Sequence, residues 1–142
     1  MIRTMMKWVA VTALTLAVAP AFAGVAVIVS AKSDAAKMSK DQVADLYLGK
    51  STAFPGGGSA KLFDQPESSA VREQFYQKLA DKSASQVKAV WSRLIFSGKA
   101  LPPKEASSDA EVKKAVASGN TAVGYIDASA VDATVKVVLT LP

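Results

Sequence analysis

Two serines and an arginine follow an extended segment that ends at Pro66, and together they could hold an anion at the start of a helix. The first turn of a helix presents backbone N–H groups without intrahelical partners, and serine hydroxyls beside them add further donors for phosphate, sulfate or a carboxylate. A cation in that first turn opposes the helix macrodipole, so a nearby anion would favour it. The predicted anion-binding residues are therefore Ser68, Ser69, Ala70, Val71 and Arg72.

A simpler interpretation of the same segment has no ligand. One of the serines would be an ordinary N-cap residue, because a hydroxyl that accepts an N–H bond from the first turn stabilises a helix by itself. Arg72 would then pair with Glu67, Asp64 or Glu73 at the surface. Both interpretations require a helix that begins near Ala70.

The composition excludes several kinds of chemistry. None of the 142 residues is a cysteine or a histidine, so zinc, copper, haem, iron–sulfur and Ser-His or Cys-His sites have no ligands or bases. The remaining catalytic candidates are Ser97 with Lys99 and Asp127 with Asp132, and neither pair has a spacing typical of activation. We therefore expect neither an enzyme nor a cofactor. The 17 basic and 12 acidic residues are scattered rather than gathered into a basic stripe, which argues against nucleic-acid binding.

The N-terminal segment has the pattern of a secretory signal peptide. Arg3 and Lys7 precede an apolar run from Trp8 to Ala19, and the segment closes on Ala21-Phe22-Ala23. A retained membrane anchor is the alternative, but this run is short for a membrane span. We expect residues 1–23 to be cleaved, which predicts export to the periplasm and a single mature domain over 24–142.

The mature segment alternates between strand and helix patterns. The unbroken apolar run 24–30 predicts a strand buried on both faces in the middle of a sheet, and further strands are expected over 60–64, 121–126 and 135–141. Capping-box spacing, a serine followed three residues later by Gln or Glu, predicts helix starts at Ser39, Ser83 and Ser108. The triple glycine of 56–58 predicts a surface turn and not a phosphate loop, because the phosphate-loop motif is incomplete there.

Two helices carry apolar stripes. Val71, Phe75 and Leu79 recur at four-residue spacing in the helix after Pro66. The following helix has a longer stripe, formed by Val87, Val90, Trp91, Leu94 and Ile95. Trp91 and Phe96 could form a ligand platform, but this spacing favours a place in the core for both.

The element order β-α-β-α-α-α-β-β predicts an α/β fold, a small mixed sheet with helices on its faces. Ligands of such sheets usually bind beyond the carboxyl ends of strands. The loops after Ser30, Asp64 and Ile126 are the expected places for a site.

Several segments, taken in order, resemble the phosphate substrate-binding proteins of ABC transporters, members of the type 2 periplasmic-binding-protein superfamily. The segment 38–50 is similar to a helix of this family that ends in aromatic-x-Gly-Lys, and 120–128 is similar to its Gly-Ala-Ile-Gly-Tyr-Val strand. The segment 69–72 falls on the family's Ser-Gly-Thr-Arg turn, which binds phosphate. Ser69 and Arg72 match that turn, whereas Ala70 and Val71 replace a glycine and a hydroxyl donor, and Gln65 stands where the family often has an arginine.

The length points to a subgroup of that family. The full family folds as two lobes that close on the ligand, and 24–142 resembles the small single-lobe members, as does the segment 91–99. The resemblance implies one three-layer lobe with a mixed sheet of about four to five strands.

The resemblance also implies a function: a periplasmic solute-binding-like protein for phosphate or another small oxyanion, associated with an ABC transporter permease or with phosphate sensing. The alternative is a non-transport interaction or sensory module derived from a single lobe. Such a module would cover a partly apolar cleft surface by docking onto a membrane sensor, a transporter or a second copy in a homodimer.

Overall fold

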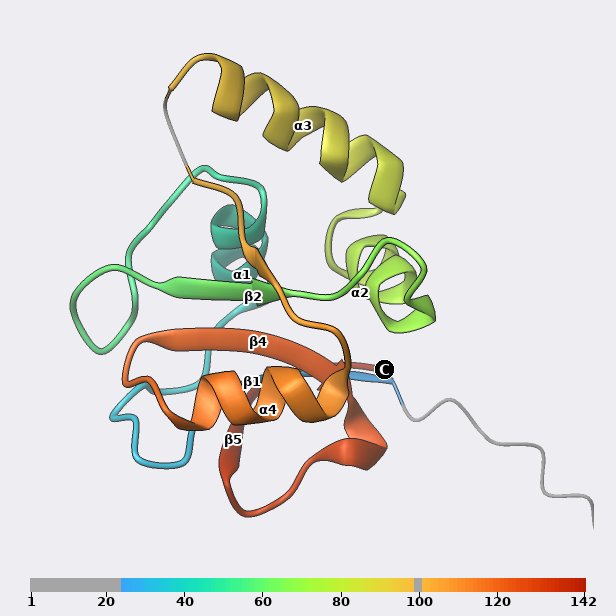
Figure 1. Cartoon of the computed structure of the whole chain (residues 1–142). Helices are drawn as coiled ribbons and strands as arrows, with labels where there is room; N and C mark the ends of the chain where they lie inside the picture. Colours follow the sequence, from blue (N-terminus) through green and yellow to red (C-terminus); the bar gives the residue numbers. More distant parts are fainter. Residues whose placement is uncertain (1–23, 99–100) are drawn as a thin grey trace, which may run out of the picture.

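The computed structural model describes residues 24–98 and 101–142 (Figure 1). The expected signal peptide, residues 1–23, and Lys99 of one catalytic candidate pair lie outside the described residues. Within the described part, none of the helices is both long and apolar enough to cross a bilayer. The elements in chain order are β1 (Val25–Ser30), α1 (Lys40–Tyr47), β2 (Lys61–Asp64), α2 (Ala70–Ala80), α3 (Ala84–Phe96), β3 (Lys104–Glu105), α4 (Asp109–Ala117), β4 (Ala122–Asp127), the 3-10 turn η1 (Ala128–Ala130) and β5 (Val135–Leu141).

The five strands form one mixed sheet in the order β3-β2-β4-β1-β5. β2 runs parallel to β3 and β4, whereas β1 runs antiparallel to both of its neighbours. The carboxyl ends of β2 and β4 therefore meet at one edge of the sheet, and β1 ends at the opposite edge. Of the three loops expected to be places for a site, the loop after Ser30 therefore lies at the other end of the strands from the loops that follow β2 and β4.

β1 is an interior strand between β4 and β5, one place from the middle of the sheet, and it is covered on both faces as its apolar run predicts. All six of its residues are buried. Val25, Val27 and Val29 contribute to the core cluster that also contains the apolar residues of α1, α2 and α3. Ala26 and Ile28 point to a second cluster, which α4 covers. Helices on both faces of one sheet give the three-layer lobe that the sequence indicates (Figure 1).

The helix starts follow the local capping signals. Ser39 and Ser83 each form a complete capping box with the glutamine three residues on. Ser108 accepts a hydrogen bond from the backbone of Glu111, but the reciprocal half of that box is missing. The segment after Pro103 contains one strand that the sequence does not predict, the two-residue β3, which is held only by its pairing with β2.

The stripe on α3 is only half buried. Val87 and Trp91 lie in the core, but Ile95 is 50% exposed and Phe96 is 95% exposed. The prediction of a core position for Phe96 is therefore wrong, because the C-terminal half of α3 extends beyond the elements that cover its first half (Figure 1).

Candidate functional site: the turn between β2 and α2

The turn from Asp64 to Arg72 leads from the carboxyl end of β2 into the N-terminus of α2. Ser69 is the N-cap residue, and its Oγ accepts a hydrogen bond from the backbone N of Arg72 at 3.2 Å. Ala70 and Val71 occupy the first two helical positions, where the N–H groups have no intrahelical acceptor. No acceptor for either N–H is found elsewhere in the described residues. Ser68 is exposed beside them.

Arg72 lies beneath this turn with its side chain 10% exposed. Its Nη1 donates to the backbone oxygen of Gln65 at 3.0 Å. Its Nε lies 3.9 Å from Oδ1 of Asp64 and is buried without a hydrogen-bond acceptor. Of the three carboxylates that the ligand-free interpretation considers for Arg72, the structure selects Asp64, and it places the pair in the interior and not at the surface.

The other two carboxylates have their own partners. Glu67 forms an ion pair of 2.6 Å with Lys88, and this hydrogen bond lowers the pKa of the Glu67 carboxyl. Glu73 accepts a hydrogen bond from the backbone N of Ala84 at 3.2 Å. Both lie on the outer surface of α2 and its preceding turn, so they do not contribute to the interior of the site.

Asp64 is the centre of a buried polar network. Its carboxylate accepts hydrogen bonds from the hydroxyl of Tyr76 at 2.6 Å, from the hydroxyl of Tyr125 and from the backbone N of Gln65 at 2.8 Å. Burial, followed by the negative charge of Asp64, raises the pKa of Tyr76 and of Tyr125 well above the usual range. Both phenols therefore remain protonated donors, and the buried carboxylate is well supplied with hydrogen bonds.

Gln65 connects the N-termini of two helices. Its Oε1 accepts from the hydroxyl of Ser69 at 2.7 Å. Its Nε2 donates to Oδ1 of Asp109, the first residue of α4, at 2.6 Å and to the backbone oxygen of Tyr125 at 3.1 Å. Only this orientation of the amide matches a hydroxyl donor on one side and two acceptors on the other. The helix starts that face the carboxyl edge of the sheet are thus held by one buried side chain.

The structure brings the five predicted residues together at one helix start, as their contiguity in sequence requires. It adds Asp64, Gln65, Tyr125 and Asp109, which sequence reasoning did not place in the site. The sequence draws attention to Gln65 only because it stands where the resembled family often has an arginine. The available signal was topological: Asp64 and the segment after Ile126 end neighbouring parallel strands.

The arrangement directs N–H groups outward from the start of α2, which is a geometry suited to an anion. Asp127 and Asp132, one of the catalytic candidate pairs, hold separate turns. Asp127 accepts from the backbone N and the hydroxyl of Ser129 at 2.9 and 2.7 Å. Within the described residues, no cluster of three or more carboxylates is arranged to hold a metal ion.

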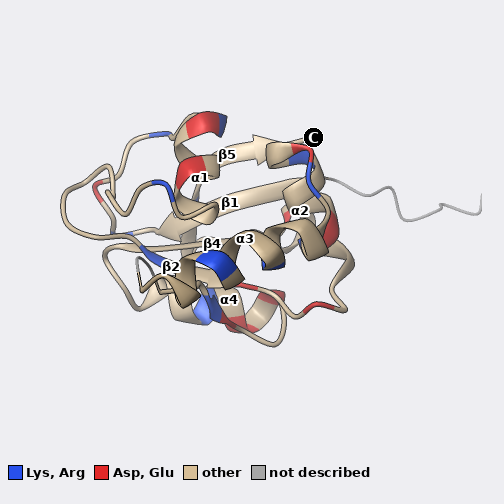
Figure 2. Ribbon diagram, turned by 90° about the horizontal axis from the view of Figure 1, so that it is seen from above, with Lys and Arg blue, Asp and Glu red and all other residues tan. Residues whose placement is uncertain are grey.

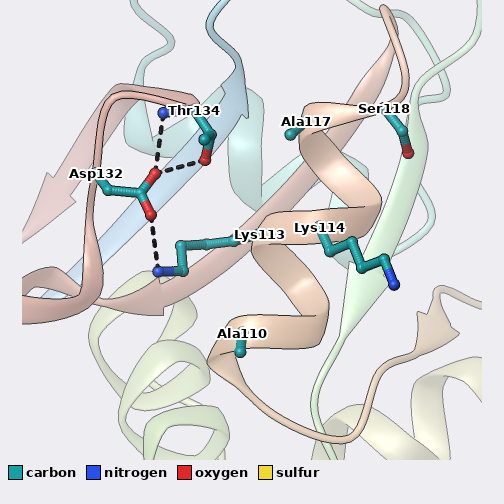
Figure 3. A pocket seen from close by; sticks show the side chains of 7 residues that line it. All are labelled: Ala110, Lys113, Lys114, Ala117, Ser118, Asp132 and Thr134. Atoms are coloured by element: carbon teal, nitrogen blue, oxygen red, sulfur yellow. Dashed lines mark hydrogen bonds and ion pairs between the residues drawn. The ribbon is translucent and has the colours of Figure 1, made fainter.

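Asp132 belongs to an open depression on α4, shown in Figure 3. Hydrogen bonds from the side chain and the backbone of Thr134, followed by one from Lys113 at 3.0 Å, lower the pKa of its carboxyl to about 2. These contacts fasten the loop before β5 to the helix. The one carboxylate of the depression is thus already hydrogen-bonded by Lys113 and Thr134.

Three solved structures share this fold. The first is a Clostridium perfringens protein assigned to the phosphate ABC transporter substrate-binding proteins, whose structure contains bound phosphate. Its TM-score is 0.66, and it is 22% identical over 81% of this chain and 44% of that chain. The second is an ABC-type phosphate transport receptor of Vibrio cholerae, with a TM-score of 0.65 and 21% identity over 81% and 45% of the two chains. PstS of Borrelia burgdorferi gives a TM-score of 0.54 and 10% identity over 81% and 46%.

The chain therefore spans less than half the length of each of these proteins. No protein-family model and no curated protein matches the sequence. The described residues, a mixed five-stranded sheet with helices on both faces, therefore share the fold of a little less than half of each of these phosphate-transport proteins.

Proposed function

We propose that this protein is a periplasmic solute-binding-like protein that holds phosphate or another small oxyanion at the N-terminus of α2. The observation that carries the proposal is the pair of first-turn N–H groups, of Ala70 and Val71, that have no acceptor, above a buried Arg72 whose Nε has none either. The likeness in fold to a structure with bound phosphate supports the same class of ligand.

Each group at the turn has a separate role in this proposal. The N–H groups of Ala70 and Val71 point along the axis of α2 and donate to two oxygens of the anion, where the helix dipole adds to the attraction. The exposed hydroxyl of Ser68 donates to a third oxygen. Ser69 keeps its cap bond to Arg72, and its proton can turn from Gln65 toward the ligand.

The resemblance extends the proposal to the site of action. A binding protein of this type would deliver its anion to an ABC-type permease or report it to a membrane sensor from the periplasm, after loss of residues 1–23. The alternative is a homodimer that covers the partly apolar cleft surface of the single lobe. Within the described residues the large exposed apolar side chains are Ile95, Phe96 and Leu101, and these lie on α3 and the segment after it, away from the α2 turn.

Titration calorimetry of the purified protein with phosphate, sulfate and acetate tests the binding site. The most informative variant is Ala70→Pro. Proline is well tolerated at the first position of a helix, and the extended backbone of Ser69 suits a residue before proline, so this change removes one proposed N–H donor while preserving the fold.

The matched control is Lys40→Pro, at the first position of α1 after another serine cap. We expect Ala70→Pro to weaken phosphate binding about tenfold, the loss of one hydrogen bond to a charged group, and Lys40→Pro to leave it unchanged. Absence of heat with every anion at millimolar concentration would refute the proposal. Equal weakening by both proline variants would place the anion elsewhere.

A further inference from the structure

The half-covered stripe of α3 forms one wall of a groove that the anion site does not use. The groove lies between the C-terminal half of α3, the end of α1 and the starts of β2 and β3, and its volume is about 980 Å³. This is at the upper end of the range of roughly 300–1,000 Å³ found for small-molecule sites. Because β2 begins in the groove and ends at the anion turn, the two places lie at opposite ends of that strand.

The floor of the groove is apolar and fixed. Leu46 and Trp91 line it from the core side, with 1% and 8% of their surfaces exposed. The indole Nε1 of Trp91 donates to the backbone oxygen of Tyr47 at 2.8 Å, so the polar atom of the ring is already satisfied inside the core. The part of the Trp91 ring that lines the groove is therefore apolar, and the neighbouring side chains of Leu62 and Ile95 are apolar too.

The backbone at Gly49 lies close to α3 beside the groove. This glycine has a φ of +75°, and a Cβ there would lie 2.4 Å from Leu94 and 3.3 Å from the ring of Trp91. The end of α1 therefore touches α3 directly at this point. The end of the Leu94 side chain can turn aside, so an added side chain at Gly49 would meet mainly the strain of the positive φ.

The rim of the groove is basic. Lys50, Lys61 and Lys104 line it and are exposed, whereas no aspartate or glutamate belongs to its described lining. None of these three lysines forms an ion pair with another described residue. Figure 2 shows basic positions along the ribbon at the start of β2, from which Lys61 lines the groove. Cations without carboxylate partners at the edge of an apolar cavity favour a ligand with an anionic head.

We propose that this groove binds a free amphipathic anion, a small molecule with an aliphatic or aromatic body and a carboxylate, sulfate or phosphate head. The body would lie against Trp91 and Ile95, and the head would reach the lysines of the rim. A second copy of the chain does not suit the groove, since two such rims would bring six lysines together. The assignment is independent of the anion turn on α2.

Fluorescence of Trp91 gives a direct readout. The chain has two tryptophans, Trp8 and Trp91, so Trp8→Phe makes Trp91 the only source of tryptophan emission whether or not the N-terminal segment is retained. Dodecanoate, kept monomeric below its micelle concentration, should change the emission of Trp91 with a saturable curve. Dodecyltrimethylammonium, which has the same chain and the opposite charge, should bind about tenfold more weakly or not at all.

The rim is tested by replacing Lys50, Lys61 and Lys104 together with glutamine and, separately, with glutamate. We expect at least about tenfold weaker dodecanoate binding for the glutamine variant and reversed preference for the cationic detergent in the glutamate variant. Lys40→Glu, on α1 outside the groove lining, is the matched control and should change nothing. Phosphate at the concentration that saturates the α2 turn, added at constant ionic strength, should not displace dodecanoate.

Three outcomes would overturn the assignment. Equal affinity for the two detergents would show that charge plays no part. Unaltered dodecanoate binding in the folded glutamine variant would place the head elsewhere. Binding to vesicles of anionic phospholipid without any response to monomeric dodecanoate would identify the surface as a membrane contact and not a ligand groove.

Discussion

The buried tyrosines make the stability of this protein sensitive to alkaline pH in a calculable way. All three tyrosines of the chain, Tyr47, Tyr76 and Tyr125, have no exposed surface. Burial, followed by the charge of Asp64, raises the pKa of each phenol well above its ordinary value. An alkaline titration of tyrosine absorbance therefore reports on the interior of the lobe and on nothing else.

The direction and the size of this change in stability with pH follow from proton linkage. In the unfolded chain the phenols lose their protons above a pH of about 10, whereas the folded chain retains them, so the unfolded state binds fewer protons there. Stability is fully present below that pH and falls as the pH rises above it. Well above that pH each phenol contributes about 1.4 kcal/mol per pH unit. Because the phenols of the unfolded chain are only half ionised at a pH of about 10, the three together lower the free energy of unfolding by about 3 kcal/mol between pH values of about 10 and 11. That is a large share of the roughly 5–15 kcal/mol that stabilises a typical domain.

Urea unfolding at a series of pH values, followed by circular dichroism, measures this slope. Phenolate absorbance should stay flat until the protein unfolds and then appear for all three tyrosines in the same transition. In Tyr125→Phe the slope should fall by about a third, since one of the three phenols is gone. Phenolate absorbance that rises near the ordinary tyrosine pKa while the dichroism remains native would refute the buried network.

Two further predictions concern packing and charge. Asp64→Asn leaves the buried Arg72 without its carboxylate and should destabilise the protein by about 3 kcal/mol in urea unfolding. Adding Arg72→Met should recover part of that loss. A double variant whose destabilisation equals the sum of the two single variants would contradict the pairing. Gly124→Ala puts a methyl group 2.6 Å from a valine of α4, and overpacking there should cost about 1–3 kcal/mol; an unchanged melting temperature would show that α4 yields without cost.

The elements that the sequence predicts well are those with local signals. The starts of α1 and α3 follow their serine caps because capping depends on residues three positions apart. β1 is recognisable because a strand covered on both faces must be apolar throughout. β3 has neither signal, since its two residues are exposed and polar and are held only by pairing with β2. The antiparallel direction of β1 relative to its neighbours is also a property of the assembled sheet, and no local sequence pattern predicts it.

The turn between β2 and α2 likewise has features that local sequence predicts and features that depend on the assembled sheet. Ser69 as a cap for α2 follows from adjacent residues. The partners of Gln65 do not, because Asp109 and Tyr125 lie 44 and 60 positions away along the chain and reach Gln65 only after the parallel strands are aligned. Arg72 illustrates the limit most clearly: three nearby carboxylates were equally available in sequence, and burial alone selects Asp64.

The internal partners determine what kind of anion recognition the turn can offer. Asp64 and Asp109 bring two negative charges near the turn, Arg72 brings one positive charge, and the N-termini of α2 and α4 each add about half a positive charge. These contributions nearly cancel, so a bound oxyanion gains little from net charge. Affinity must then come from the direction of the N–H groups of Ala70 and Val71 and of nearby hydroxyls, which do not depend on a long-range field. Binding at this turn should accordingly weaken only slightly with added salt, whereas the unpaired lysines of the α3 groove should make binding there strongly salt-dependent.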